Sequence, residues 1–276
     1  MTGRSIFNFL LKSVFLGVAV AALLLVFLPD LRQGKGLAQG FFNSPSVSAS
    51  RESYFTALSR SAPAVVNIYS VSIENGSGLF RNQSRGRTNL GSGVIMTENG
   101  YLLTCHHVVA DADSIYVAVQ NGRILEAQIV GTDPLTDLAV LKVTADNLHI
   151  IPQASEPDTH VGDVVMAIGN PFDLGQTITQ GIVSRAGRNG LSNYVDFIQT
   201  DAVLNQGNSG GALVDSNGIL LGITNANFQV LDSNNRARNV DGINFAVPYE
   251  LAKRVMDEII SNGRVVRGQL GFVGGE

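Results

Sequence analysis

The hydrophobic and polar positions divide the chain into an apolar N-terminal segment, a polar connection and a long body of short apolar runs. Residues 13–28, SVFLGVAVAALLLVFL, carry no charge. With the apolar residues just before them, they approach the roughly 20 residues that a helix needs to cross a bilayer. The small-x-small site of a cleaved signal peptide does not follow directly, because residues 27–30 read FLPD. We therefore predict an uncleaved transmembrane anchor with a cytoplasmic stub at residues 1–29; a cleaved signal peptide is the alternative.

The rest of the chain is predicted to be a linker and a β-rich domain. Residues 30–52 are rich in Gly, Ser and Ala without helical or strand periodicity, which predicts a flexible linker. From residue 53 onward, short apolar runs alternate with turn residues. Their spacing predicts two packed β-barrels or sandwiches in a domain at residues 53–265. Strands are predicted at residues 64–72, 93–96, 101–104, 114–120, 137–143, 164–168, 177–184, 197–200, 211–215, 219–224 and 242–247, with a loop at residues 75–91.

One helix is predicted to close this domain, over residues 249–262. Pro248 suits the start of a helix, and Gly263 can end it. Leu251, Val255 and Ile259 recur at intervals of four, which places them on one face.

Composition excludes some classes of function and stabilisation. The net charge of −4 and the pI near 5.6 give no basic footprint, so no nucleic-acid partner is expected. Cys105 is the one cysteine of the chain, so no intrachain disulfide can form. Thirty glycines and 45% hydrophobic residues favour a β-rich globular body that is stabilised by core packing.

The order of the candidate catalytic residues is informative. Ser209 stands between glycines in GNSGG, residues 207–211, and all four histidines of the chain precede it. In α/β-hydrolases the catalytic histidine follows the serine, so that class is excluded; a chymotrypsin-type site runs His, Asp, Ser. The flanking glycines allow a sharp turn in which the amides of Gly207 and Ser209 point at one oxygen. A plain glycine-rich turn is the alternative for this motif alone.

The serine needs a base, and the base needs a carboxylate. His107 follows a predicted strand; if His106 and His107 lie on that strand, they face opposite ways, so one is expected to be exposed. His149 and His160 lie in loop-like sequence and are expected at the surface. Asp137 precedes an apolar strand and needs a hydrogen-bond partner there, whereas Asp133 is explained as a turn former. A metal site at the paired histidines is disfavoured, because only Cys105 lies nearby at ligand spacing.

At these residues the chain closely resembles the HtrA family of chymotrypsin-fold serine proteases. The matching segments cover nearly all of residues 60–260, in order. The family usually has asparagine where Cys105 and His106 stand. The matching segments are GSGVI (91–95), YLLTCHHVV (101–109), DPLTDLAVLKV (133–143), AIGNPF (167–172), QTITQGIVS (176–184), QTDAVLNQGNSGGALVD (199–215) and GINFAVP (242–248).

The resemblance implies an all-β fold of two packed six-stranded barrels, at about 60–150 and 160–248, before the short C-terminal helix. It implies His107 as general base, Asp137 as its orienter and Ser209 as nucleophile, without metal or cofactor. The oxyanion hole is expected at Gly207, Asn208 and Ser209. A substrate strand is expected to pair with residues 223–228. The remaining expected site residues are the substrate-binding Val203, Leu204, Ile223, Thr224 and Asn225 and the regulatory-loop Arg188.

Within the family, the anchor points to the DegS/AlgW-like branch. That branch implies a trimeric protease in the periplasm, tethered to the bacterial inner membrane, that makes the first cut in an anti-sigma factor during envelope stress. Residues 266–276 are expected to begin a linker to a PDZ domain that this sequence does not contain. An alternative function is a peptide-binding or chaperone-like module whose triad is inactive or at rest.

Overall fold

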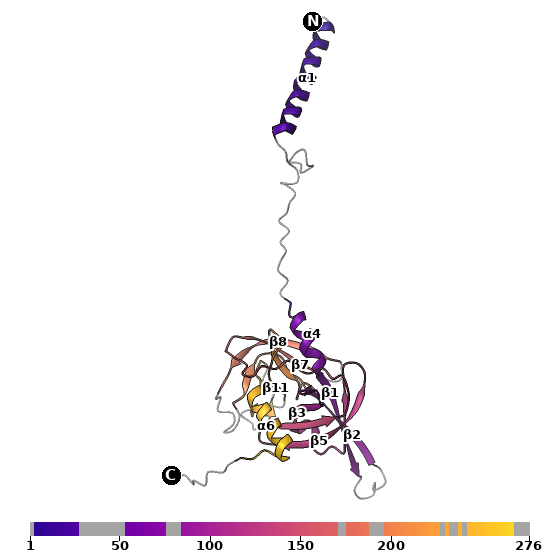
Figure 1. Cartoon of the computed structure of the whole chain (residues 1–276), viewed down its shortest axis with the longest axis vertical. Helices are drawn as coiled ribbons and strands as arrows, with labels where there is room; N and C mark the ends of the chain where they lie inside the picture. Colours follow the sequence, from indigo (N-terminus) through magenta and orange to yellow (C-terminus); the bar gives the residue numbers. More distant parts are fainter. Residues whose placement is uncertain are drawn as a thin grey trace, which may run out of the picture. The chain divides into compact units, whose positions relative to one another are not determined.

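The computed structural model describes residues 3–27, 53–75, 84–170, 175–187, 196–226, 230–231, 237–238 and 242–267. The chain divides into two compact units, Met1–Glu52 and Ser53–Glu276 (Figure 1). The first unit contains helix α1 (Gly3–Phe27). Within the described residues, one segment of α1, Phe7–Leu24, is long and apolar enough to cross a membrane. An N-terminal signal sequence would meet the same criteria of length and hydropathy.

The second unit contains two closed six-stranded β-barrels, as the sequence and its resemblance predict. Both barrels join their strands in the same order: the first, second, third, sixth, fifth and fourth strands of each are consecutive neighbours. All pairs are antiparallel. Barrel 1 is built from β1 (Val65–Asn75), β2 (Ser84–Ile95), β3 (Tyr101–Cys105), β4 (Ser114–Ala118), β5 (Ile124–Asp133) and β6 (Leu138–Val143). Barrel 2 is built from β7 (Val164–Gly169), β8 (Thr177–Arg185), β9 (Ile198–Thr200), β10 (Ala212–Asp215), β11 (Leu220–Asn225) and β14 (Asn244–Pro248).

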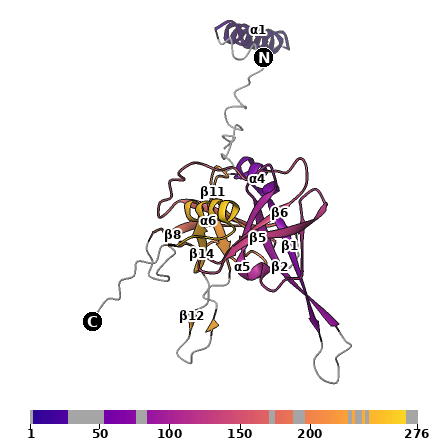
Figure 2. The ribbon, with the colours of Figure 1, turned by 60° about the horizontal axis from the view of Figure 1, so that its bottom comes forward.

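Short helices and a small hairpin complete the unit. Helix α4 (Phe55–Ser61) and the 3-10 turn η1 (Ala62–Ala64) precede barrel 1, and α5 (His106–Val109) follows β3. The strands β12 (Val230–Leu231) and β13 (Ala237–Arg238) pair with each other (Figure 2). Helix α6 (Tyr249–Asn262) has the predicted bounds, and Gly263 ends it with a left-handed φ of 73°. Its buried residues pack against strands of both barrels.

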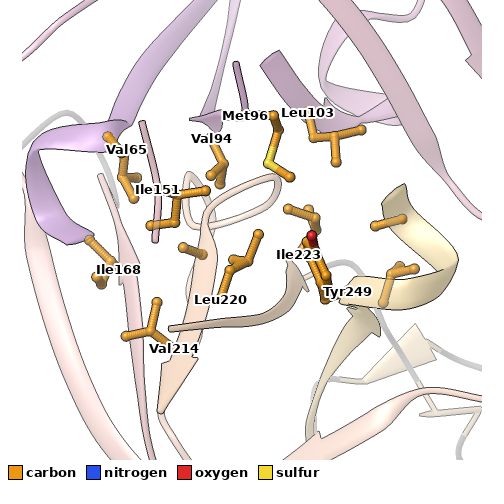
Figure 3. Packing of buried hydrophobic residues seen from close by; sticks show 14 of the residues in the cluster. Val65, Val94, Met96, Leu103, Ile151, Ile168, Val214, Leu220, Ile223 and Tyr249 are labelled. Carbon is orange, nitrogen blue, oxygen red and sulfur yellow. The ribbon is translucent and has the colours of Figure 1, made fainter. Parts of the chain in front are cut away.

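A common hydrophobic core joins the two barrels (Figure 3). Val94 and Leu103 of barrel 1 pack in one cluster with Ile168 and Ile223 of barrel 2, and all four side chains are fully or almost fully buried. Tyr249 of α6 belongs to the same cluster. Because protein interiors are close-packed and resist deformation, this core fixes loops of one barrel against loops of the other.

The structure corrects three predictions of secondary structure. The loop predicted at residues 75–91 is shorter, because β1 continues to Asn75 and β2 begins at Ser84. These outer parts of β1 and β2 extend from barrel 1 as a two-stranded arm (Figure 2). Strand β5 was not predicted from the sequence. Most of its side chains are exposed or half-buried, and a register shift between Ile129 and Gly131 interrupts the alternation of buried and exposed positions. His106 and His107 lie in α5 and not on a strand, and neither is exposed.

Asp133, at the end of β5, is more than a turn residue. Its carboxylate accepts a hydrogen bond from the Thr136 hydroxyl at 2.5 Å and forms a two-pronged ion pair with Arg267, whose Nη1 donates to Oδ1 at 2.7 Å. Burial acts to raise the pKa of Asp133, but the bonds and charge of Arg267, together with Thr136, outweigh burial and hold that pKa below its usual value. The ion pair therefore fastens the segment after α6 to barrel 1.

Replacing Arg267 by methionine is expected to lower the free energy of unfolding at pH 7 by about 1–3 kcal/mol, because Asp133 stays buried without its cation. Since the folded-state pKa of Asp133 is depressed, the ionised carboxylate stabilises the fold above its unfolded pKa of about 3.9. That contribution is lost as the pH falls through the folded-state pKa. Urea titrations at pH 7 and below pH 4 should show the difference between the variant and wild type shrinking in acid. The exposed Arg264, replaced by methionine, is the control; an equal loss for both variants would contradict this account.

Candidate active site

The three residues of the predicted triad come from ends of strands in both barrels. His107 lies in α5, directly after β3, and Asp137 directly precedes β6 in barrel 1. Ser209 lies in the turn before β10 of barrel 2. β3 and β6 are neighbours, with Cys105 opposite Leu138, so the pairing of these strands brings His107 to Asp137.

His107 and Asp137 are held together by several hydrogen bonds. The ring Nδ1 of His107 lies 2.6 Å from Oδ2 of Asp137, and the backbone amide of His107 donates to Oδ1 at 3.0 Å. The amide of His106 donates to the carbonyl of Asp137 at 2.9 Å. Asp137 adopts a left-handed φ of 56°, which non-glycine residues rarely do outside turns and functional sites. The backbone of Asp137 is thus bent so that both its carbonyl and its carboxylate reach α5.

Asn225, at the end of β11, adds a contact from the other barrel. Its Nδ2 donates to Oδ2 of Asp137 at 2.9 Å. The carboxylate of Asp137 therefore accepts three hydrogen bonds at a half-buried position, and these fix its orientation. A carboxylate fixed in this way can hold one tautomer of His107, with the proton on Nδ1 and the lone pair on Nε2.

The turn that carries Ser209 is built on glycine. Gly207 and Gly210 have φ values of 100° and 84°, a region that side chains disfavour. Gly210 also packs against barrel 1: a Cβ there would lie 2.2 Å from the carbonyl oxygen of Ser92 and 2.3 Å from the hydroxyl of Thr104. The glycines of GNSGG are therefore required both for the turn and for its close approach to barrel 1.

The polar groups around Ser209 are only partly engaged. Its Oγ accepts a hydrogen bond from the amide of Ala226 at 3.2 Å, and Ser209 is 5% exposed. Within the described ranges, no hydrogen bond joins Ser209 Oγ to His107. Catalytic hydrogen bonds are often long in free enzymes and tighten with substrate, so this spacing is compatible with catalysis.

The backbone amides of the turn divide into two kinds. The amide of Asn208 donates to the carbonyl of Asn205 at 3.0 Å, so it is already used. The amides of Gly207 and Ser209 donate to no acceptor in the described part of the chain. The amides of Gly207 and Ser209 are thus two free donors that flank the Gly207–Asn208 peptide, and an oxyanion hole requires such a pair of donors.

Cys105 lies buried beneath the pair of His107 and Asp137. Its thiol donates to the carbonyl of Thr224 at 3.4 Å. Burial raises the pKa of the Cys105 thiol well above its ordinary value, and the charge of Asp137 raises it further. The ligand atoms of Cys105, His107 and Asp137 all lie within 4.8 Å of one another. A metal would need the thiolate, which burial disfavours, and would have to break the bond between His107 and Asp137. The three groups are therefore better explained as a catalytic pair above a buried thiol.

Cys105 is expected to be unreactive in the folded protein, because thiol reagents attack the thiolate and need access to it. Titration with a chromogenic disulfide at pH 8 should detect no thiol in the native chain and one thiol after unfolding in urea. A Cys105→Ala variant should give none in either state. Rapid reaction of the native chain would contradict the burial described above.

The predicted substrate-binding residues are only partly available. Val203 is exposed, whereas Leu204, Ile223 and Thr224 are buried. β11 pairs with β10 on one side and with β14 on the other, and the pairing with β14 extends to Asn225. Ile223 is paired on both sides, with Ala212 and with Val247, and Thr224 exchanges backbone hydrogen bonds with Gly210 and Gly211. The pairing of a substrate strand with residues 223–228 stays a prediction. A hollow of about 490 Å³ beside His107 was not predicted. It is lined by Ser72, Ile73, Arg87, Asn89, Ala110, Asp111 and Asp113.

The other predicted residues are placed as follows. Arg188 lies outside the described residues. His149 and His160 are exposed, as predicted. The Nδ1 atom of His106 is buried without a partner in the described part of the chain. The role of Asn225 toward Asp137 was missed, because no local pattern reveals a contact between strands 88 residues apart.

Three comparisons with known proteins agree with this geometry. The trypsin-like peptidase domain matches at residues 91–223. The serine endoprotease DegS of Escherichia coli is 50% identical over 270 residues, which cover 97% of this chain and 74% of DegS. The crystal structure of the serine endoprotease from Yersinia pestis has a TM-score of 0.66 and 51% identity, over 81% of this chain and 72% of that one. The HtrA-type protease AlgW with a decapeptide has a TM-score of 0.68 and 47% identity, over 80% and 71% of the two chains.

Proposed function

The chain belongs to the HtrA family of trypsin-like serine endoproteases, and from this premise we propose that it is a membrane-anchored periplasmic enzyme that cuts a regulatory polypeptide. The observation that carries the catalytic part of this proposal is the 2.6 Å contact between His107 and Asp137, at the ends of strands that also meet the turn of Ser209. That arrangement supports acyl transfer through a serine nucleophile. It needs no cofactor or metal for any step.

In the proposed mechanism, Ser209 Oγ attacks the carbonyl carbon of the scissile peptide bond while Nε2 of His107 takes the hydroxyl proton. Asp137 stabilises the imidazolium that forms. The tetrahedral intermediate collapses as His107 gives the proton to the leaving amine, which leaves an acyl-enzyme on Ser209. A water molecule then repeats the two steps, with His107 as base and then as acid, and releases the second product.

The negative oxygen of the tetrahedral intermediate is assigned to the amides of Gly207 and Ser209. Support comes from their lack of acceptors within the described residues, in contrast to the amide of Asn208. Donors that are already in place, in a water-poor site, need no reorganisation when charge develops on the oxygen. The amide of Asn208, which was also predicted to belong to the oxyanion hole, is therefore not assigned to it.

The regulatory part of the proposal rests on similarity and on α1. DegS and AlgW are two relatives that each match most of the chain, and the apolar helix Gly3–Phe27 fits an anchor. We assign the enzyme to the bacterial inner membrane, with one transmembrane helix and the protease domain in the periplasm. The proposed substrate is the periplasmic part of an anti-sigma factor, cut first during envelope stress. The proposed assembly is a homotrimer, and Phe55 of α4, which is 76% exposed, offers an apolar contact for it.

A second candidate is a peptide-binding or chaperone-like module with a resting triad. One observation favours it: Ser209 Oγ is bonded to the amide of Ala226 and not to His107. A resting site of this kind would bind an unfolded polypeptide and slow its aggregation without cutting it. Measuring cleavage and aggregation of the same unfolded protein separates the two candidates.

The proposed function can be tested in Gram-negative cells that express the full chain together with a membrane-bound anti-sigma factor. The chain is expected to remain in inner membranes after a carbonate wash, and added protease is expected to reach its domain in spheroplasts. The anti-sigma factor should be shortened in cells with the wild-type chain and intact in cells with Ser209→Ala. Equal shortening in both, or release of the chain by carbonate, would refute the corresponding part of the proposal.

A further inference from the structure

Ser92 of β2 is a barrel 1 residue whose polar groups are directed at the catalytic turn of barrel 2. It is completely buried, at 0% exposure. Its amide donates to the carbonyl of Ser209 at 2.8 Å, and its hydroxyl donates to the carbonyl of Gly207 at 2.7 Å. Ser92 thus holds the two carbonyl groups on either side of Asn208.

The direction of the hydroxyl proton follows from a third contact. The amide of Asn170, which follows β7, donates to Ser92 Oγ at 3.0 Å. A serine hydroxyl has one proton and can both donate and accept. Because the amide of Asn170 donates a hydrogen bond to Oγ, the hydroxyl of Ser92 can donate its own hydrogen bond to the carbonyl of Gly207. The hydroxyl therefore links β7 to the catalytic turn and leaves no unused donor.

Ser92 is itself held in place. Its carbonyl accepts a hydrogen bond from the Thr104 hydroxyl at 2.7 Å, and Gly210 packs directly on that carbonyl. Small displacements of Ser92 would break these contacts. The hydroxyl is therefore a fixed donor and not a mobile side chain that meets the turn by chance.

These contacts bear on the orientation of the oxyanion donors. The peptide group between Gly207 and Asn208 lies between the peptide groups that carry the amides of Gly207 and Ser209. A peptide group is planar, so holding its oxygen fixes the plane of the whole group. Glycine has unusual freedom to rotate, and Gly207 sits at a φ of 100°. Without the Ser92 hydroxyl, the 207–208 peptide could turn and the two amides would no longer converge.

We propose that Ser92 is a positioning residue for the oxyanion hole: it acts through the Gly207–Asn208 peptide and touches no substrate. The proposal rests on the function proposed above, because it gives the Gly207 and Ser209 amides a catalytic role. It predicts a selective loss of transition-state stabilisation. Substrate binding should be retained, because Ser92 is completely buried and has no surface that a bound peptide could contact.

The test is the Ser92→Ala variant of the full chain in detergent, assayed with a peptide ester or amide substrate. We expect kcat to fall about tenfold to a hundredfold with little change in KM, because a donor displaced by a fraction of an ångström stabilises the intermediate poorly. A peptide boronate, which forms a tetrahedral adduct with the serine, should lose affinity by a similar factor. A non-covalent product peptide should bind as before.

Ser61→Ala is the matched control, since Ser61 is also 0% exposed and its hydroxyl donates to a backbone carbonyl within α4. It should keep the wild-type kcat. If Ser92→Ala does not fold, as judged by thermal unfolding, Ser92→Cys keeps a somewhat larger side chain at this position with only a weak donor and should show a similar loss of kcat.

Three results would overturn the proposal: a wild-type kcat in the folded Ser92 variants, an equal loss of product-peptide binding, or an equal loss of kcat in Ser61→Ala. Failure of the proposed function itself looks different. In that case the wild-type chain would neither turn over the substrate nor bind the boronate.

Discussion

Replacing Ser209 by alanine is expected to lower kcat for peptide hydrolysis by about 10⁶-fold, close to the effect of removing a whole triad. Ser209 supplies the nucleophile of the acylation step, and without its hydroxyl no acyl-enzyme can form. The fold should survive, because within the described residues the hydroxyl accepts one hydrogen bond, from the amide of Ala226, and its loss costs about 1 kcal/mol. The measurement is turnover of a fluorogenic peptide by the full chain, together with a thermal melt.

The matched control for this variant is Ser155→Ala, at an exposed serine before β7. It should keep wild-type turnover and an unchanged melting temperature. Residual turnover near the wild-type rate in Ser209→Ala would mean that another nucleophile acts in this site. Loss of folding in that variant would contradict the modest role of the hydroxyl in stability.

The second large effect is expected for Asp137→Asn, with a loss of about 10⁴-fold in kcat. Asparagine has nearly the same shape, so the turn and the backbone contacts to α5 should persist. Its amide, however, carries one oxygen and no charge, whereas the carboxylate accepts bonds from the His107 amide, from His107 Nδ1 and from Asn225. His107 would then adopt the wrong tautomer, and its imidazolium would lose a counter-charge.

Asp133→Asn offers the matched control, because Asp133 is also an acid beside β6 but bonds to Arg267 and Thr136. It should weaken the fold and leave kcat nearly unchanged. Steady-state kinetics on both variants separate the two roles. Equal losses of kcat would show that charge near β6, and not the contact with His107, supports catalysis.

Much of the fold was predictable from local pattern. Helix α6 shows clear periodicity between Pro248 and Gly263, and its observed bounds match those predicted. Most barrel strands are short, buried runs between turn residues. β5 escaped prediction because most of its side chains are exposed or half-buried and its register shifts near Gly131, which interrupts the alternation. β8 also has few buried residues, but its exposed and half-buried positions alternate, so local pattern still reveals it.

The catalytic residues of the candidate site were predictable from sequence motifs, whereas the contacts that hold them in place were not. Residue order and resemblance selected His107, Asp137 and Ser209, and the structure places His107 against Asp137. The contacts of Ser92 and Asn225 depend on how two barrels pack, so no spacing in the sequence points to them. The substrate strand was predicted at residues 223–228 from the family resemblance; which edges of β11 are already occupied is decided by its neighbours in the barrel.

The central claim is that Ser209 is a nucleophile activated by His107 and Asp137 in this chain. The most direct measurement is labelling of the native full-length chain with a fluorophosphonate, followed by mass spectrometry of its peptides. We predict one adduct on Ser209 of the wild-type chain, no adduct in Ser209→Ala, and greatly slowed labelling in Asp137→Asn. An unlabelled Ser209 in the folded wild-type chain, or labelling that ignores Asp137, would contradict the claim.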